Sequence, residues 1–224
     1  MIQLDHKEVG KFWDKNAENW TNLTRMGYDR SRDLINSPAF FKMLPEISGL
    51  NGLDIGCGEG YNTRIAAKRG GIMTAIDISE VFIKYAKETE EQESLGITYQ
   101  VASAIDLPYF DNYFDFAIAT MSLMDIAENE KAIQEVFRVI KPGGFFQFSI
   151  THPFVSNSDY KWIKNEEGRK IGFVIKDYFK KLNGKLEEWI FGAAPKEVTD
   201  KMRKFRIPRF TRTLSEWLNL LIQI

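Results

Sequence analysis

The stretch LDIGCGEG, residues 53–60, decides the fold. An apolar run at residues 50–55, broken only at Asn51-Gly52, leads into its glycines and predicts a buried strand. A helix is predicted to begin directly afterwards, over residues 61–68. Glycines let a ligand approach the backbone because they lack a Cβ, and the first amides of a helix have no intrahelical partner. Strand, turn and helix together predict a nucleotide-binding geometry.

The spacing of the glycines separates two kinds of nucleotide site. A dinucleotide fingerprint reads G-x-G-x-x-G, whereas here Gly60 comes one residue early and Tyr61 takes the dinucleotide position. Asp54 stands two residues before Gly56, and we expect its side chain at the mouth of the site. A carboxylate there would repel a pyrophosphate and would suit a cationic amino group or a sulfonium.

This stretch resembles the first motif of class I S-adenosylmethionine (SAM) dependent methyltransferases, D-x-G-x-G-x-G, and the resemblance extends through most of residues 10–153. It implies an α/β fold, a Rossmann-like, doubly wound, mostly parallel sheet in a three-layer α/β/α arrangement. It also implies SAM as cofactor and S-adenosylhomocysteine (SAH) as product. The motif residues that the resemblance assigns to cofactor binding are Asp54, Gly56, Cys57, Gly58 and Gly60.

A second acidic residue follows at the end of the next predicted strand, residues 72–77. Asp77 closes this strand seventeen residues beyond Gly60, where a carboxylate can accept both ribose hydroxyls. Ile78 is placed to lie against the adenine face. NAD enzymes use the same acidic residue, so Asp77 predicts an adenosine without choosing between the two cofactors.

The loop after the third predicted strand, residues 97–102, is expected to hold the adenine ring. Its sequence SAIDLPY, residues 103–109, resembles the family's G-D-A-x-x-L-P-F stretch, in which the aspartate receives the adenine amino group. Ser103 stands in that place, and its hydroxyl can accept one hydrogen bond. The backbone amides of Ala104 and Ile105 are predicted partners of the ring nitrogens.

Two further candidates follow the fourth and fifth predicted strands. Met121 lies just past the strand at residues 113–120, at the strand end where open α/β sheets bind ligands. A K-P-G-G turn at residues 141–144 leads into the strand at 145–151, and His152 ends it. His152 is a candidate general base or substrate contact. The alternative is a histidine that hydrogen-bonds its own loop.

The N-terminal part, residues 1–48, is predicted to be a helical cap. The pattern W-D-x-x-A-x-x-W puts Trp13, Ala17 and Trp20 at helical spacing. Such a helix buries its tryptophans in the core or covers the cofactor, as the corresponding helix does in the family. Arg32 is a candidate for the carboxylate of the methionine moiety.

Residues 49–154 are expected to form the SAM-binding core, and residues 155–224 a substrate-side, α-rich insertion with a C-terminal helix. The family fold ordinarily adds two more strands, and no sequence remains here to supply them. Residues 159–212 carry 15 Lys and Arg against 8 Asp and Glu, whereas residues 1–158 carry 15 against 22. The excess of lysine there either attracts an anionic partner such as RNA or is a solvated face.

Composition limits the remaining classes. The 224-residue chain has a net charge of −1, so no global charge favours nucleic acid or membrane. Cys57 is the sole cysteine and the two histidines lie far apart in sequence, so we predict no internal disulfide and no metal site. No run approaches the about 20 apolar residues that span a bilayer, and we expect a cytoplasmic protein.

The sequence therefore predicts a methyltransferase that passes a methyl group from SAM to a small-molecule acceptor by in-line displacement, acting as a monomer or homodimer without a membrane partner. An RNA-modifying methyltransferase is one alternative, with nucleic acid as partner. A non-catalytic SAM-binding or scaffold protein is another. An NAD-dependent oxidoreductase is disfavoured by the glycine spacing and by Asp54.

Overall fold

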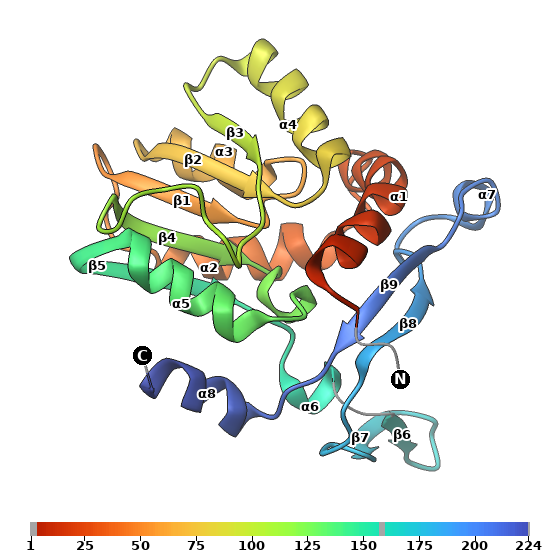
Figure 1. Cartoon of the computed structure of the whole chain (residues 1–224). Helices are drawn as coiled ribbons and strands as arrows, with labels where there is room; N and C mark the ends of the chain where they lie inside the picture. Colours follow the sequence, from red (N-terminus) through yellow and green to blue (C-terminus); the bar gives the residue numbers. More distant parts are fainter. Residues whose placement is uncertain (1–3, 157–159, 224) are drawn as a thin grey trace.

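The computed structural model describes residues 4–156 and 160–223. Its centre is a parallel sheet in the order β3-β2-β1-β4-β5, which confirms the predicted α/β, doubly wound arrangement (Figure 1). The strands are β1 Asn51–Ile55, β2 Ile72–Asp77, β3 Thr98–Val101, β4 Phe114–Thr120 and β5 Ile140–Ser149. The strand order reverses between β1 and β4, and their carboxyl ends define the place where such sheets bind ligands.

Helices cover both faces of this sheet. One face packs on α2 (Ser37–Met43), α3 (Tyr61–Lys68) and α4 (Glu80–Glu93), through buried residues such as Phe40, Ala66 and Ile83. The other packs on α5 (Asn129–Val139) and α8 (Leu214–Ile222), through residues such as Ile133 and Trp217. The apolar sequence of β4 follows from this, because side chains on both of its faces are buried.

The K-P-G-G segment lies inside β5 as an irregularity. Phe114 pairs with Ile140 and Phe116 with Phe145, so the residues between Ile140 and Phe145 are extra on the β5 side. Gly143 has a φ of +84°, a conformation that glycine adopts without strain. The turn predicted before the fifth strand is thus a bulge within it.

The segment after β5 is not α-rich, and that prediction was wrong. It begins with a short helix, α6 (Pro153–Ser156), and continues as the antiparallel pairs β6 (Tyr160–Lys164) with β7 (Lys170–Ile175), and β8 (Asn183–Trp189) with β9 (Phe205–Phe210). One further turn of helix is α7 (Lys196–Thr199). Aromatic residues of this segment pair across strands, as Trp162 does with Phe173.

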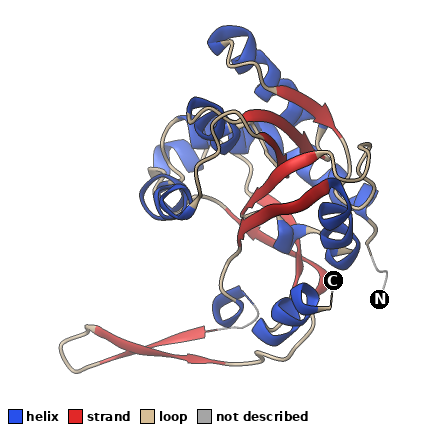
Figure 2. Cartoon of the chain, turned by 90° about the vertical axis from the view of Figure 1, so that its left-hand side faces the viewer, coloured by secondary structure: helices blue, strands red, loops and turns tan. Residues whose placement is uncertain are grey.

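The two small sheets differ in their surroundings. The β6–β7 hairpin projects away from the rest of the chain (Figure 2). The β8–β9 pair packs on α1 (His6–Arg25), and the Asn16 side chain bonds both the N–H and the C=O of Arg206. Two short helical turns complete the described elements, η1 (Arg32–Asn36) before α2 and η2 (Leu123–Asp125) after β4.

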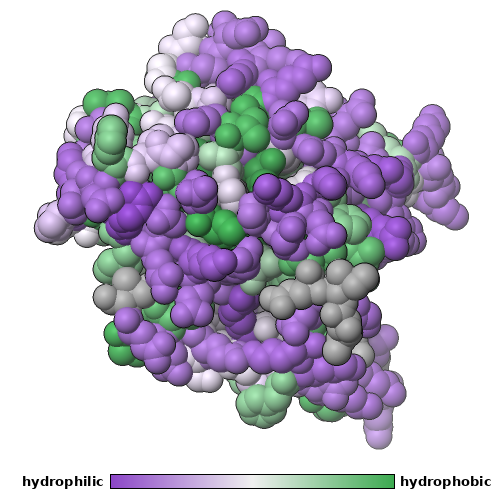
Figure 3. All heavy atoms as spheres, in the orientation of Figure 1, coloured by the Kyte–Doolittle hydropathy of each residue, from purple (hydrophilic) through white to green (hydrophobic). Residues whose placement is uncertain are grey.

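The face in Figure 3 is covered largely by hydrophilic residues, with hydrophobic ones exposed between them. Among the residues that the structure describes, no helix combines the length and the apolar character needed to cross a bilayer.

Candidate functional site

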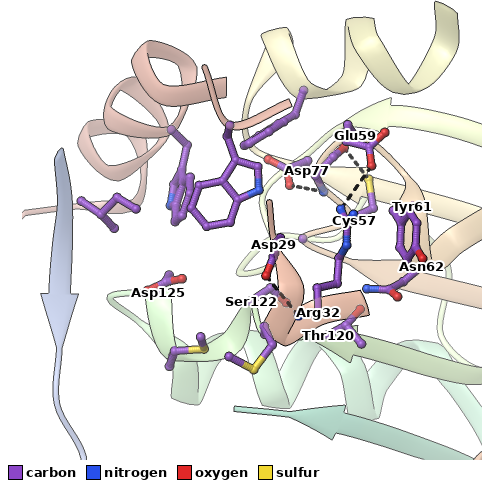
Figure 4. A pocket seen from close by; sticks show the side chains of 18 of the residues that line it. Asp29, Arg32, Cys57, Glu59, Tyr61, Asn62, Asp77, Thr120, Ser122 and Asp125 are labelled. Carbon is purple, nitrogen blue, oxygen red and sulfur yellow. Dashed lines mark hydrogen bonds and ion pairs between the residues drawn. The ribbon is translucent and has the colours of Figure 1, made fainter. Parts of the chain in front are cut away.

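A cavity of about 660 Å³ lies at the carboxyl ends of β1, β2 and β4. Its other walls come from α1, the segment 28–36, and the β8–β9 pair. Figure 4 shows polar side chains that line this cavity, among them Arg32 of the segment 28–36, Asp77 at the end of β2 and Thr120 at the end of β4. The volume falls within the roughly 300–1,000 Å³ range of small-molecule sites.

The glycine turn forms the floor of this cavity. Gly56, Gly58 and Gly60 all have positive φ, which explains why the turn requires glycine. A Cβ at Gly58 would meet no atom within 4 Å, whereas a Cβ at Gly60 would lie 2.4 Å from the Tyr99 hydroxyl. Gly56, Cys57 and Gly58 line the cavity, and Gly60 does not. Gly58 is therefore the position at which a ligand can approach the backbone.

Asp77 stands beside this turn at the end of β2. Its Oδ2 accepts a hydrogen bond from the Gly58 N–H at 2.8 Å, and its Oδ1 accepts one from the Ser79 N–H at 2.9 Å. Burial raises the pKa of Asp77 to about 6, although these two hydrogen bonds act in the opposite direction and lower it. The carboxyl group lines the cavity, and its remaining lone pairs can accept further hydrogen bonds.

Asp54 does not lie at the mouth of the site, and that prediction was wrong. Its side chain is fully buried under the turn, and its Oδ2 accepts a 2.6 Å hydrogen bond from the Thr63 hydroxyl on α3. Burial raises the pKa of this carboxyl to about 7. Strand alternation is the cause: Leu53 and Ile55 belong to the cluster on one face of β1, so Asp54 turns to the other face.

The acidic residues that do line the cavity are Asp29, Glu59, Asp77 and Asp125. Asp29 precedes η1 and accepts a hydrogen bond from the Arg32 N–H at 3.0 Å. Burial raises its pKa above the usual value. The expected negative lining is thus supplied by residues other than Asp54.

Arg32 lies in the cavity wall within a group of charges. Its Nε is 2.8 Å from Asp33, its guanidinium lies 3.8 Å from the centre of the Tyr61 ring, and Nη1 is 3.8 Å from Glu59. The buried Glu59 also pairs with Arg64 at 2.9 Å and with Arg25 at 3.7 Å. Glu59 was not predicted as a site residue, although it stands between two turn glycines of the motif.

Trp20 lines the cavity and also packs in an aromatic cluster with Trp189, Phe191 and Phe205. Trp13 meets Trp20 edge-to-face at 5.6 Å. Both tryptophans are partly buried among other aromatic residues, and both line the cavity. The residues of β8 and β9 that complete this wall were not predicted, because their alternation is interrupted by lysine and glutamate.

Other predicted residues divide between the cavity and its surroundings. Ile78, Ser103, Ala104 and Met121 line it, and Ile105 does not. Met121 has a φ of +55°, a strained conformation for a residue with a side chain. Its N–H is held by the Ser149 carbonyl at 2.9 Å. Cys57 is a free thiol whose pKa is raised by burial.

His152 lies outside the cavity, which Thr151 lines instead. Its ring is stacked on Phe154, and its Nδ1 accepts a hydrogen bond from the Phe154 N–H at 3.2 Å. This geometry favours the alternative in which His152 orders its own loop.

Comparison with known proteins gives the same family as the motifs. Residues 53–148 match a family model described as a methyltransferase domain. A ubiquinone biosynthesis O-methyltransferase of Coxiella burnetii is 34% identical over 149 residues, which cover 65% of this chain and 62% of that protein. The chain thus spans less than two thirds of the length of this relative.

Solved structures extend the likeness beyond the central sheet. A S-adenosylmethionine dependent methyltransferase from Mesorhizobium loti aligns with a TM-score of 0.63 and 28% identity, over 83% of this chain and 78% of that one. A structure from Listeria monocytogenes aligns with a TM-score of 0.64 at 23% identity, over 84% and 78%, and shows the fold alone. Residues 53–148 therefore form a methyltransferase domain, and the chain is similar to S-adenosylmethionine-dependent methyltransferases over most of its length.

Proposed function

We propose that this chain binds SAM in the cavity and transfers its methyl group to a small-molecule acceptor. The observation that carries the proposal is the pairing of Gly58 with Asp77, which offers open space at the backbone beside an acceptor carboxyl. An adenosyl group requires both features. Its ribose hydroxyls donate hydrogen bonds to a carboxylate, and the ligand passes close to the backbone of the glycine turn.

The site residues named from the sequence are assigned on this basis. Asp77 accepts from the ribose, Ile78 lies along the adenine, and Ser103 with the amides of Ala104 and Ile105 contacts the ring edge. Arg32 faces the methionine carboxylate, and Trp20 covers the cofactor. In support, six of these seven residues line one cavity, and Ile105 follows directly after Ala104 in the same loop.

SAM supplies a methyl group already activated on a sulfonium, so the protein has little covalent chemistry to do. The residues of this chain bind and orient the two reactants, and they exclude water from the site. Aligning two reactants in this way is worth about 7–11 kcal/mol. Aromatic residues from α1 and β8–β9 close the cavity on the side away from the sheet, which keeps water from the reacting groups.

A small acceptor is favoured over a nucleic acid by the cavity itself, which is walled by Trp189 and Ile207. The O-methyltransferase relative supports the same class. Several basic residues of the segment after β5 are paired with acidic ones, as Arg209 is with Glu187 and Lys181 with Glu216. Fewer unpaired positive charges are therefore left to bind RNA.

We further propose a cytoplasmic location, because a lone cysteine suits a reducing compartment, and a monomer or homodimer as the assembly.

Calorimetry with SAM, SAH and NAD tests the proposal. We expect SAM and SAH to bind at one site per chain, and NAD not to bind. Tight binding of NAD without SAM would contradict it. Incubation with radiolabelled SAM and a panel of small hydroxyl and amino compounds then separates an enzyme from a non-catalytic SAM-binding protein. Salt-dependent binding of tRNA would instead support an RNA acceptor.

A further inference from the structure

The cavity has a second polar end, away from the glycine turn. Asp125 ends η2 after β4, and Arg209 lies on β9, which packs against η2. Figure 4 shows Asp125 apart from the group formed by Asp29, Arg32 and Asn62. This end lies beyond the residues assigned to the adenosyl and methionine groups.

The carboxyl group of Asp125 can accept hydrogen bonds but has no donor among the described residues. Its backbone N–H bonds the Ser122 carbonyl, but its carboxyl forms no hydrogen bond or ion pair with any residue of 4–156 or 160–223. Arg209 is a positive charge that acts on this carboxyl, but its Nη1 donates to Glu187 at 2.8 Å and its Nη2 to the Ser156 carbonyl at 3.2 Å. This half-buried carboxyl lines the cavity, so its oxygens can accept a hydrogen bond from a ligand bound there.

The walls around Asp125 are apolar. Met121, Met124 and Ile126 lie on its own side of the cavity, and Trp189 and Ile207 on the side of β8–β9. Methionine side chains adapt to flat or irregular apolar groups, and tryptophan offers a flat surface. The space therefore suits an apolar molecule with one polar group directed at Asp125.

Burial raises the pKa of Asp125 to about 7, with Arg209 lowering it and Glu187 raising it. A carboxyl group with this pKa is partly ionised near neutral pH, which is where a proton acceptor works best. The polar group of the ligand must donate a hydrogen bond to this carboxyl, and it must be neutral, because the walls around Asp125 are apolar and an ammonium group would lose its hydration there. A hydroxyl satisfies both conditions.

We infer that the methyl acceptor is an apolar compound carrying a hydroxyl group, and that this hydroxyl binds to and is deprotonated by Asp125. This inference rests on the proposed function. In the transfer, the acceptor oxygen forms a bond to the methyl carbon and the S–CH₃ bond breaks with its electron pair left on sulfur. The hydroxyl proton passes to the Asp125 carboxylate, so SAH leaves as a neutral thioether and the charges balance.

Binding of three matched probes tests the inference: 4-butylphenol, butylbenzene and 4-butylaniline, measured by ligand-observed NMR with and without SAH. We expect the wild-type protein to bind 4-butylphenol at least tenfold more tightly than butylbenzene. In Asp125→Leu this preference should fall below threefold, with butylbenzene bound no more weakly. Asp125→Asn, which keeps an acceptor oxygen, should retain part of it. Asp200→Leu, which removes an exposed carboxyl of the same kind, should leave the preference unchanged.

Three results would overturn the inference: no preference for the phenol in the wild type, an unchanged preference in Asp125→Leu, or tighter binding of the aniline. Calorimetry with SAH and circular dichroism on each variant keep this test separate from that of the proposed function. If SAH fails to bind the wild type, the proposed function fails, while the probe preference in the absence of SAH still decides whether Asp125 binds a hydroxyl group.

Discussion

The Thr63 hydroxyl donates a 2.6 Å hydrogen bond to Asp54 Oδ2, joining the first helix after the glycine turn to the strand before it. The acidic residue of the motif therefore holds the turn in place from beneath, and the cavity is bordered by other carboxyls. The charge of the nearby Asp77 adds to the effect of burial and raises the pKa of Asp54 further.

Asp54→Asn should change how stability depends on pH. The pKa of Asp54 is about 7 in the folded protein and 3.8 when unperturbed, so the folded state keeps a proton that the unfolded chain releases. Its contribution to stability is therefore present below about pH 4 and is lost as the pH rises through 7. We expect the melting temperature of the variant, relative to wild type, to increase from pH 4 to pH 8. A constant difference across this range would show that the carboxyl stays ionised.

Gly58→Ala and Gly60→Ala should have separate effects. Both glycines have positive φ, so either alanine costs about 1–2 kcal/mol in backbone strain. At Gly60 the new methyl group also meets the Tyr99 ring, whereas at Gly58 it meets open space. We expect Gly60→Ala to lower the melting temperature further, and Gly58→Ala to weaken SAM binding more than its small loss of stability explains. Thermal unfolding and calorimetry measure the two effects. Equal losses of stability would contradict the assignment.

Asp77→Asn should weaken SAM binding by about 1–3 kcal/mol, roughly a fivefold to 150-fold increase in Kd, because charge-assisted hydrogen bonds to the ribose are lost. The amide oxygen can still accept one of the two backbone hydrogen bonds, from Gly58 or from Ser79. Asp115→Asn serves as the control, since that carboxylate bonds Lys141 and the Asn51 N–H away from the cavity. Unchanged affinity in Asp77→Asn would refute the ribose contact.

Glu59→Gln should destabilise the fold by about 3 kcal/mol, because it leaves three arginines around a buried site without their shared anion. Glu88→Gln is the matched control. Its partner Lys84 is 3.8 Å away on an exposed face of α4, where such pairs contribute less than about 1 kcal/mol. Urea unfolding compares the two variants, and similar losses would show that burial does not strengthen the Glu59 group.

The central sheet was predictable because each strand carries its own signal. The glycine turn, Asp77 at the end of β2 and the apolar run of β4 are local patterns, and each fixes one element. The cavity-lining residues among them follow directly from where parallel strands end.

The other parts of the fold and the site depend on contacts between distant segments, which no local sequence pattern predicts. Asp54 was misplaced because its orientation depends on which face of β1 packs on which helix. The segment after β5 was misassigned because basic and aromatic residues at mixed spacing suit both helices and half-exposed strands. Asp125 followed a recognised strand, but its importance appears only when β9, more than eighty residues later, lies across from it.

The packing of β9 on α1 has a consequence for how the site forms during synthesis. Asn16 bonds the backbone of Arg206, and Trp20 touches Phe205, so the cavity wall joins the beginning of the chain to a segment near residue 210. A ribosome making this protein releases the glycine turn and the parallel strands long before that wall can close. A chain halted before β9 would carry every recognisable motif and still leave the cavity open along one side.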